Sequence, residues 1–193
     1  PFTTSETTLG GIYIVRDPRN IFTSIKNHFS MSDEEAFKML TDKNRGLISD
    51  EGIFSSYTFI SSWSNHYISW IKNNKFRRLI IKYEDLINNT YETFRDIAVF
   101  SNTLLNITDG VNKEKLKSAI ETTNFKKLKH YEIKEGLHNS VTNFKKWRNI
   151  HKENKNLFFN LGPENNWKNK INKEISNKIE KYFEKEMVEL KYL

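Results

Sequence analysis

The stretch that decides the fold reads Tyr13-Ile14-Val15-Arg16-Asp17-Pro18-Arg19-Asn20-Ile21-Phe22-Thr23-Ser24. Its first part is a β-branched and aromatic run, which predicts a buried strand over residues 12–15. Asp17 is a good helix N-cap and Pro18 suits the first helical position, so a helix should begin directly after the strand. Ser24 lies on that helix, eight residues after Arg16.

Hydrophobic periodicity predicts the other elements. A second buried strand is expected at residues 79–81, closing at Tyr83-Glu84-Asp85. Helices are expected over residues 32–40 (with Ser32 as cap and Glu35 three residues on), 54–71, 91–100, 113–120, 125–131 and, as one last helix, 171–190. Residues 42–53 are expected to form a loop and residues 132–156 a mobile loop. Strands that alternate with helices predict an α/β fold with a parallel sheet, as one domain over residues 1–193.

The composition is that of a globular protein that favours anionic partners. The chain has 193 residues, 37% of them hydrophobic, and a formal net charge of +7. A phosphorylated nucleotide, nucleic acid or a membrane surface would each satisfy that charge. The absence of cysteine excludes disulfides, thiolate metal sites and a thiol nucleophile. No apolar run approaches the ~20 residues that span a bilayer. No His, Asp or Glu cluster has the spacing of metal ligands.

Arg16 and Ser24 are the first candidates for a binding site. Ligands of open α/β sheets bind beyond the carboxyl ends of the strands, where Arg16 is expected. A guanidinium there can hold a phosphate through two hydrogen bonds. A hydroxyl on the following helix adds a donor, and the helix N-terminus adds positive potential. From the residues alone the alternative stays open that Arg16 pairs with a structural carboxylate and Ser24 is an ordinary helix residue.

Four segments, in order along the chain, resemble motifs of the cytosolic-type sulfotransferases. Residues 13–24 are similar to the family's 3'-phosphate motif, with Asn20 where the family usually has Asp. Residues 80–86 resemble its strand that ends in Tyr-Glu-Asp-Leu. Residues 122–128 resemble its Thr-Ser-Phe-x-x-(Met/Leu) stretch. Residues 158–168 are similar to Phe-Phe-Arg-Lys-Gly-x-x-Gly-Asp-Trp-(Lys/Arg).

The resemblance implies a set of nucleotide contacts. Arg16 and Ser24 would bind the 3'-phosphate of 3'-phosphoadenosine 5'-phosphosulfate, which leaves the reaction as adenosine 3',5'-bisphosphate. Tyr83 would contact the adenine, Thr123 would hydrogen-bond the base, and Phe125 would pack on the purine. From the residues alone, Tyr83 and Phe125 can equally be core aromatics.

The fourth segment departs from the family pattern where charge matters. Gly162 and Trp167 keep the register, but Asn160 and Leu161 replace the Arg-Lys pair that grips the 3'-phosphate. Asn donates hydrogen bonds without a charge and Leu donates none. Because charged phosphate contacts are roughly twice as strong as neutral ones, a weaker hold on the nucleotide is expected, with Asn160 and Gly162 still at the cofactor site.

The resemblance also implies a P-loop NTPase-like sulfotransferase fold of which only the C-terminal part is present. The sequence contains no Pro-Lys-x-Gly-Thr-Thr type loop to cradle the 5'-phosphosulfate, and the family's catalytic His would precede Pro1. None of the five histidines stands in that position. The first strand and the phosphosulfate loop are therefore expected to be missing, no catalytic residue is assigned, and the chain alone is expected to be inactive.

The expected function is that of a cytoplasmic sulfotransferase acting on an acceptor hydroxyl or amine, without a metal, a membrane span or a nucleic-acid partner. The acceptor is not indicated. The family's dimer motif is not reproduced after Lys168, so the oligomeric state is not indicated either. The alternative is a non-catalytic basic protein on the same fold that recognises an anionic nucleotide, nucleic acid or polysaccharide. A kinase-like phosphotransferase is disfavoured because the sequence has no Walker loop.

Overall fold

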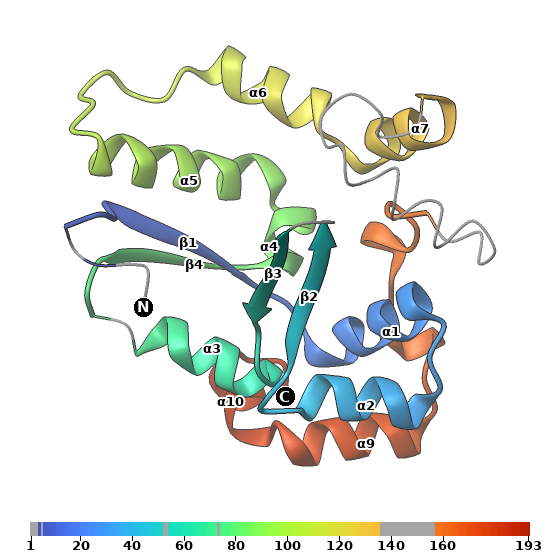
Figure 1. The fold of residues 1–193 in the computed structure, drawn as a ribbon. Coiled ribbons are helices and arrows are strands. Elements are labelled where there is room, and N and C mark those ends of the chain that lie inside the picture. The colour runs from blue at the N-terminus through green and yellow to red at the C-terminus, as the bar shows by residue number, and fades with distance from the viewer. Residues whose placement is uncertain (1–3, 5, 52–53, 73, 136–156) are drawn as a thin grey trace. The chain divides into compact units, whose positions relative to one another are not determined.

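The computed structural model of the chain (Figure 1) describes residues 4, 6–51, 54–72, 74–135 and 157–193. The chain forms two compact units. The first unit comprises Pro1–Arg16 and Tyr67–Asn124, and the second comprises Asp17–His66 and Phe125–Leu193. Each unit therefore joins stretches that are distant in sequence. That the whole chain is one domain remains a prediction.

The first unit contains the predicted parallel pair of strands. β1 (Gly10–Val15) pairs with β4 (Arg77–Lys82) in parallel, in a register that runs from Gly10↔Arg77 to Val15↔Lys82. β4 is followed by α4 (Tyr83–Asn88), α5 (Thr90–Leu104) and α6 (Lys113–Thr122). A small parallel sheet flanked by helices confirms the predicted α/β class. The P-loop relation of the fold and a missing first strand stay predictions.

Side chains alternate between the two faces of β1, and the two faces contact different helices. On one face Gly10 lies against Leu104 of α5, at a distance that leaves no room for a Cβ. On the other face Tyr13, which is buried, stacks on Trp70 of α3 (Trp63–Ile71) with ring centroids 5.1 Å apart. Burial, followed by the charge of Tyr67, raises the pKa of the Tyr13 phenol. Tyr13 is thus a core residue of the first unit.

The second unit is mainly helical. It contains α1 (Pro18–Phe29), α2 (Asp33–Thr41), the first part of α3 (Trp63–Ile71), α7 (Phe125–Glu135), two short 3₁₀ turns η1 (Gly162–Glu164) and η2 (Trp167–Asn169), α9 (Lys173–Tyr182) and α10 (Glu184–Glu189). The predicted capping box is present, since Ser32 and Glu35 each accept a backbone N–H of the other. Phe22, Ile179, Phe183 and Met187 are fully buried and form the core of this unit.

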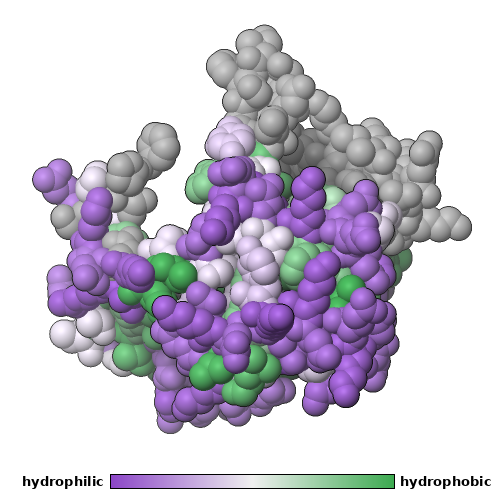
Figure 2. Space-filling view, turned by 90° about the horizontal axis from the view of Figure 1, so that it is seen from below, coloured by the Kyte–Doolittle hydropathy of each residue, from purple (hydrophilic) through white to green (hydrophobic). Residues whose placement is uncertain are grey.

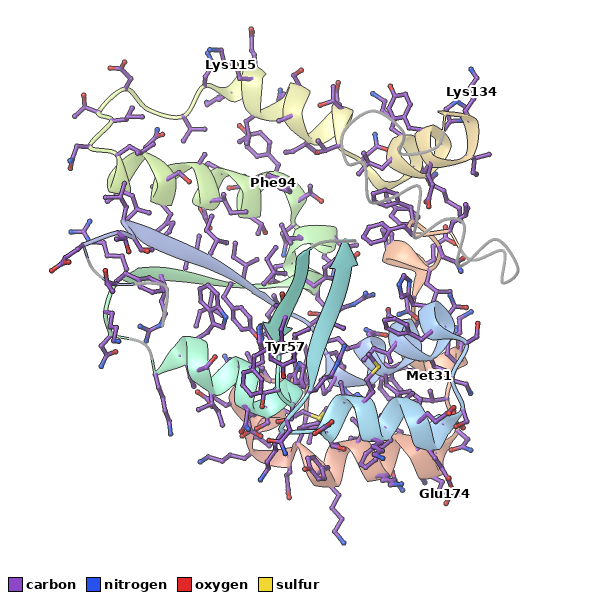
Figure 3. The ribbon with its side chains drawn as sticks, viewed as in Figure 1. Met31, Tyr57, Phe94, Lys115, Lys134 and Glu174 are labelled. Atoms are coloured by element: carbon purple, nitrogen blue, oxygen red, sulfur yellow. The ribbon has the colours of Figure 1, made fainter. Side chains whose placement is uncertain are left out.

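Charged side chains cover the outer faces of the helices. Lys173, Lys178 and Lys181 of α9 are exposed, and hydrophilic residues predominate on the face shown in Figure 2. Lys115 on α6 and Glu174 on α9 likewise point outward (Figure 3). Within the described parts of the chain, no helix combines the length and the apolar character that crossing a bilayer requires.

The predictions for residues 42–71 are wrong in part, because a β-hairpin replaces the end of the loop and the first turns of the helix. β2 (Gly46–Glu51) pairs antiparallel with β3 (Phe54–Phe59), and α3 begins only at Trp63. Apolar residues three or four apart fitted a helix here, but the run is rich in aromatic and β-branched residues that suit strands. The Tyr57 ring, labelled in Figure 3, lies across Gly46, where a Cβ would overlap it.

The predicted last helix is two helices that meet at Phe183. This residue leaves the helical region, with φ −112° and ψ 18°, and separates α9 from α10. Its ring is fully buried and packs edge-on against Trp63, with centroids 5.1 Å apart. Local periodicity continues through the break, so the pattern did not reveal it. The predicted loop over residues 132–156 is wrong at its start, since α7 extends to Glu135, and residues 136–156 lie outside the described part of the chain.

Candidate functional site

The start of α1 is held by a buried charge network in the second unit. The Asp17 carboxylate caps the helix by accepting the backbone N–H of Arg19 at 2.9 Å, and it binds the Arg19 guanidinium at 2.7 Å. The same guanidinium donates to Glu180 at 2.6 Å and to the Tyr192 carbonyl oxygen at 3.0 Å. Burial opposes the charged form, but the hydrogen bonds and charges of Asp17 and Glu180 outweigh it and raise the pKa of Arg19. These bonds link the start of α1 to α9 and to Tyr192 near the C-terminal end of the chain.

Trp167 is fixed against the same helix start. Its ring lies under the Arg19 guanidinium, with 4.0 Å from the guanidinium carbon to the ring centroid. Its backbone N–H donates to the side-chain oxygen of Asn20 at 2.9 Å. Either oxygen of an Asp would accept that bond equally well, so Asn20 keeps this function at the position where the resembled pattern has Asp.

Ser24 contacts the segment of residues 158–167, which we call the loop segment, through Asn165. The Asn165 side chain is buried, and its amide nitrogen donates to the Ser24 hydroxyl oxygen at 3.0 Å and to the Asn20 carbonyl oxygen at 2.9 Å. The Thr23 hydroxyl lies 2.8 Å from both the Asn165 side-chain oxygen and the Asn20 carbonyl oxygen, and its single hydrogen serves these two acceptors. A buried carboxamide thus connects the loop segment to consecutive turns of α1.

Three contacts show that the loop segment runs antiparallel to α1. Trp167 meets Asn20, Asn165 meets Ser24, and Phe158 meets His28, with 6.5 Å between the last two ring centroids. Asn20, Ser24 and His28 are spaced four residues apart and therefore lie along one face of the helix. This face, with the loop segment beside it, forms the candidate site of the second unit.

Gly162 and Phe125, two predicted site residues, come together in the second unit. Gly162 has φ +53°, a backbone conformation that favours glycine, and a Cβ there would overlap the Phe125 ring. Phe125 also packs edge-on against Phe159, with ring centroids 5.9 Å apart. The positive φ and the nearby Phe125 ring therefore both explain why a glycine stands at this position of the motif. The half-buried Phe125 packs on Gly162 and Phe159 here, and its predicted contact with the purine stays a prediction.

α7 holds the beginning of the loop segment through two charged side chains. The buried carboxylate of Glu132 accepts the backbone N–H groups of Phe158 at 2.7 Å and Phe159 at 2.8 Å. Lys129, one helical turn earlier, donates to the Asn160 carbonyl oxygen at 3.2 Å. A cation therefore lies next to the position where the resembled motif carries its Arg-Lys pair, although it comes from another element.

Arg16 and Tyr83 meet in the first unit. Because Val15 pairs with Lys82, the residues that follow them lie at the same carboxyl edge of the parallel pair. The Arg16 guanidinium carbon is 4.1 Å from the centroid of the Tyr83 ring. Two of the predicted site residues thus lie together at this edge, as a cation over an aromatic ring.

Thr123 is placed at the end of α6, where it is exposed. Its hydroxyl donates to the Ala119 carbonyl oxygen at 2.7 Å, a bond back onto its own helix. Its oxygen retains the capacity to accept a hydrogen bond, so a contact with the amino group of a base is compatible with this geometry. The predicted role of Thr123 stays a prediction.

Several residues of the site were not singled out from the sequence, namely Arg19, Lys129, Glu132 and Asn165. Arg19 directly follows the predicted Asp17-Pro18 helix start, so its proximity to the cap gave a usable signal. Asn165 and Ser24 are 141 residues apart, and no local pattern relates them. Among the described residues, no group of three or more His, Asp or Glu side chains is arranged to hold a metal ion.

Comparison with known proteins gives one match. A family model described as the sulfotransferase domain matches residues 5–191, nearly the whole chain, and so covers all four of the segments that carry the sequence resemblance. No curated protein and no solved structure gives a significant match.

Proposed function

Because the chain belongs to the sulfotransferase family, we propose that it binds 3'-phosphoadenosine 5'-phosphosulfate and takes part in transferring its sulfuryl group to an acceptor hydroxyl or amine. Sulfuryl transfer in general follows from the family. The nucleotide donor, the acceptor class and the residues that contact them are the proposal.

The observation that carries the proposal is the position of Ser24 beside the loop segment. The resemblance assigns the 3'-phosphate contacts to both, and in the second unit they are joined by the bonds of Asn165. A phosphate at this place would meet the Ser24 hydroxyl, a donor on α1. Lys129 of α7 supplies a positive charge beside the loop segment, which partly offsets the uncharged Asn160 and Leu161. The donor set therefore fits a phosphate.

Arg16 and Tyr83 support the same proposal from the first unit. The Arg16 guanidinium lies over the Tyr83 ring, and the N–H groups in the guanidinium plane can bind a phosphate through paired hydrogen bonds. The Tyr83 hydroxyl can reach the edge of a base, as the resemblance implies. The nucleotide supplies an activated sulfuryl group, and the role proposed for these residues of the chain is to bind and orient it.

The proposal predicts that the chain distinguishes nucleotides by their 3'-phosphate. Adenosine 3',5'-bisphosphate should raise the melting temperature more than adenosine 5'-monophosphate does. At a hundredfold excess over Kd, mass action contributes about 2.7 kcal/mol, or roughly 5–10 °C for a protein of this size. Thermal-shift titration with both nucleotides measures the difference, and equal shifts would contradict the proposal.

The non-catalytic alternative gives a different result in the same assay. A basic protein that binds polyanions should show no 3'-phosphate preference, and its binding to a polyanion should weaken steeply as salt is raised. The uncharged Asn160 and Leu161 favour this alternative, whereas the placement of Ser24 and of Arg16 on Tyr83 favours the enzyme. A salt titration with heparin and with a single-stranded oligonucleotide separates the two.

A further inference from the structure

Asn165 is a buried polar side chain of the candidate site. It is 3% exposed, and its carboxamide contacts three groups of α1: the Asn20 carbonyl oxygen, the Ser24 hydroxyl and the Thr23 hydroxyl. In the pattern that the loop segment resembles, this position is a glycine, which has no side chain to make such contacts. The contacts therefore belong to this chain's own sequence.

The contacts determine which way round the carboxamide lies. A backbone carbonyl oxygen can only accept a hydrogen bond, so the atom 2.9 Å from the Asn20 carbonyl oxygen must be the amide nitrogen. The second hydrogen of that nitrogen is then directed at the Ser24 oxygen, 3.0 Å away. Ser24 is consequently the acceptor of this bond.

Because Ser24 accepts the hydrogen bond from Asn165, its own hydroxyl hydrogen can still be donated to another group. A hydroxyl carries one hydrogen and two lone pairs, and Asn165 occupies a lone pair. Among the described residues, the Ser24 hydroxyl has no protein acceptor for its hydrogen. A phosphate oxygen accepts hydrogen bonds, so the Ser24 hydroxyl can donate its hydrogen to a phosphate.

We propose that Asn165 is a positioning residue that makes the Ser24 hydroxyl a hydrogen-bond donor toward the 3'-phosphate. This inference rests on the proposed function, in which Ser24 contacts that phosphate. Asn165 itself does not touch the ligand. Because its amide N–H occupies a lone pair of Ser24, the Ser24 hydrogen cannot be directed at the Asn165 side chain and stays available for the anion.

A double-mutant cycle tests the inference, because a residue that acts only through Ser24 has no effect once the hydroxyl is gone. Affinities for adenosine 3',5'-bisphosphate and adenosine 5'-monophosphate are measured by calorimetry for the unmodified chain, Asn165→Ala, Ser24→Ala and the double variant. Asn165→Ala should weaken bisphosphate binding about fivefold and Ser24→Ala about tenfold. The double variant should be no weaker than Ser24→Ala, and binding of the monophosphate should change little throughout.

Two further variants keep the test decisive. Asn172→Ala is the matched control, since this exposed asparagine lies outside the loop segment and its side chain accepts the Ile175 N–H at the start of α9. It should leave the 3'-phosphate preference unchanged. Asn165→Asp keeps the size of the side chain if Asn165→Ala does not fold. Its oxygens can only accept, so the Ser24 hydrogen should turn to it and bisphosphate binding should fall at least as far as in Ser24→Ala.

The outcomes separate this inference from the function on which it rests. If the unmodified chain shows no preference for the bisphosphate, the proposed function fails and the inference with it. If the preference exists but Asn165→Ala weakens binding by the same factor with and without the Ser24 hydroxyl, the positioning role is overturned while the proposed function stands. Unchanged binding in Asn165→Asp would overturn it as well.

Discussion

At the scale of single residues, Arg16 shows how one side chain can serve both packing and binding. Its guanidinium carbon lies over the Tyr83 ring, 4.1 Å from the ring centroid, and the guanidinium N–H groups can donate to an anion. Stacking limits the rotation of a long side chain and so lowers the entropy lost when it binds an anion. Lysine would keep the charge at this position but would lose both the stacking and the paired hydrogen bonds.

Arg16→Ala should abolish the preference for a 3'-phosphate, because it removes the guanidinium that is proposed to bind this phosphate. Tyr83→Phe keeps the ring under Arg16 and removes only a hydroxyl, worth ~1 kcal/mol or about fivefold in affinity. Calorimetry with adenosine 3',5'-bisphosphate measures both. Arg77→Ala, an exposed arginine at the start of β4, is the control for the loss of one positive charge. Unchanged affinity in Arg16→Ala would show that the site is assigned to the wrong residues.

At the scale of elements, the loop segment has a defined path because helices hold it at both ends. Glu132 of α7 accepts two of its backbone N–H groups, and Asn20 of α1 accepts the Trp167 N–H. Gly162 lets the chain turn against Phe125. These contacts fix the backbone on both sides of residues 160 and 161. The Asn and Leu at these two positions carry no charge.

Asn160→Arg together with Leu161→Lys should therefore tighten nucleotide binding, since it restores the charged pair of the resembled motif on a backbone that already has its path. Each charge-assisted phosphate bond is worth ~1.5–3 kcal/mol, so a gain of at least tenfold is expected. Ser118→Arg with Ala119→Lys adds the same two charges at exposed positions of α6 and controls for general attraction. If both pairs raise the affinity equally, the loop segment has no specific role in holding the phosphate.

At the scale of the whole molecule, charge and burial link folding stability to pH. His66 on α3 has its pKa lowered from 6.5, because burial disfavours the charged imidazolium. The unfolded chain takes up a proton near pH 6.5, whereas the folded chain takes it up only at lower pH. The free energy of unfolding must then fall as the pH drops below about 6.5, and this fall ends once the pH lies below the folded pKa.

His66→Gln should remove this loss of stability between neutral and mildly acidic pH. Urea unfolding at pH 7.5 and pH 5.5 gives the free energy of unfolding at each pH, and the difference should be smaller in the variant than in the unmodified chain. His130→Gln, at an exposed position of α7, is the matched control for replacing a histidine, and the difference should be smaller in His66→Gln than in this control. An identical pH dependence in His66→Gln would mean that other groups cause it.

How much could be predicted from the sequence depends on how far apart along the chain the interacting residues lie. The Asp17 cap, the Ser32 capping box and the strand before Arg16 depend on residues within four positions of each other, and all three are present. The hairpin at Gly46–Phe59 depends on pairing between two strands, and the break at Phe183 depends on packing against Trp63. Both were missed, because apolar periodicity does not report on such partners.

The same distinction applies to the candidate site. The sequence by itself determined which residue types stand at the helix start, that Arg16 ends a strand, that Gly162 keeps a register, and that the chain resembles a sulfotransferase. Only the tertiary structure decided that Arg16 stacks on Tyr83, that Lys129 and Glu132 of α7 hold the loop segment, and that Asn165 sets the hydrogen bond of Ser24. Helix caps and strand runs are encoded by near neighbours, whereas the direction of a hydroxyl hydrogen depends on a buried carboxamide 141 residues away that only folding brings into contact.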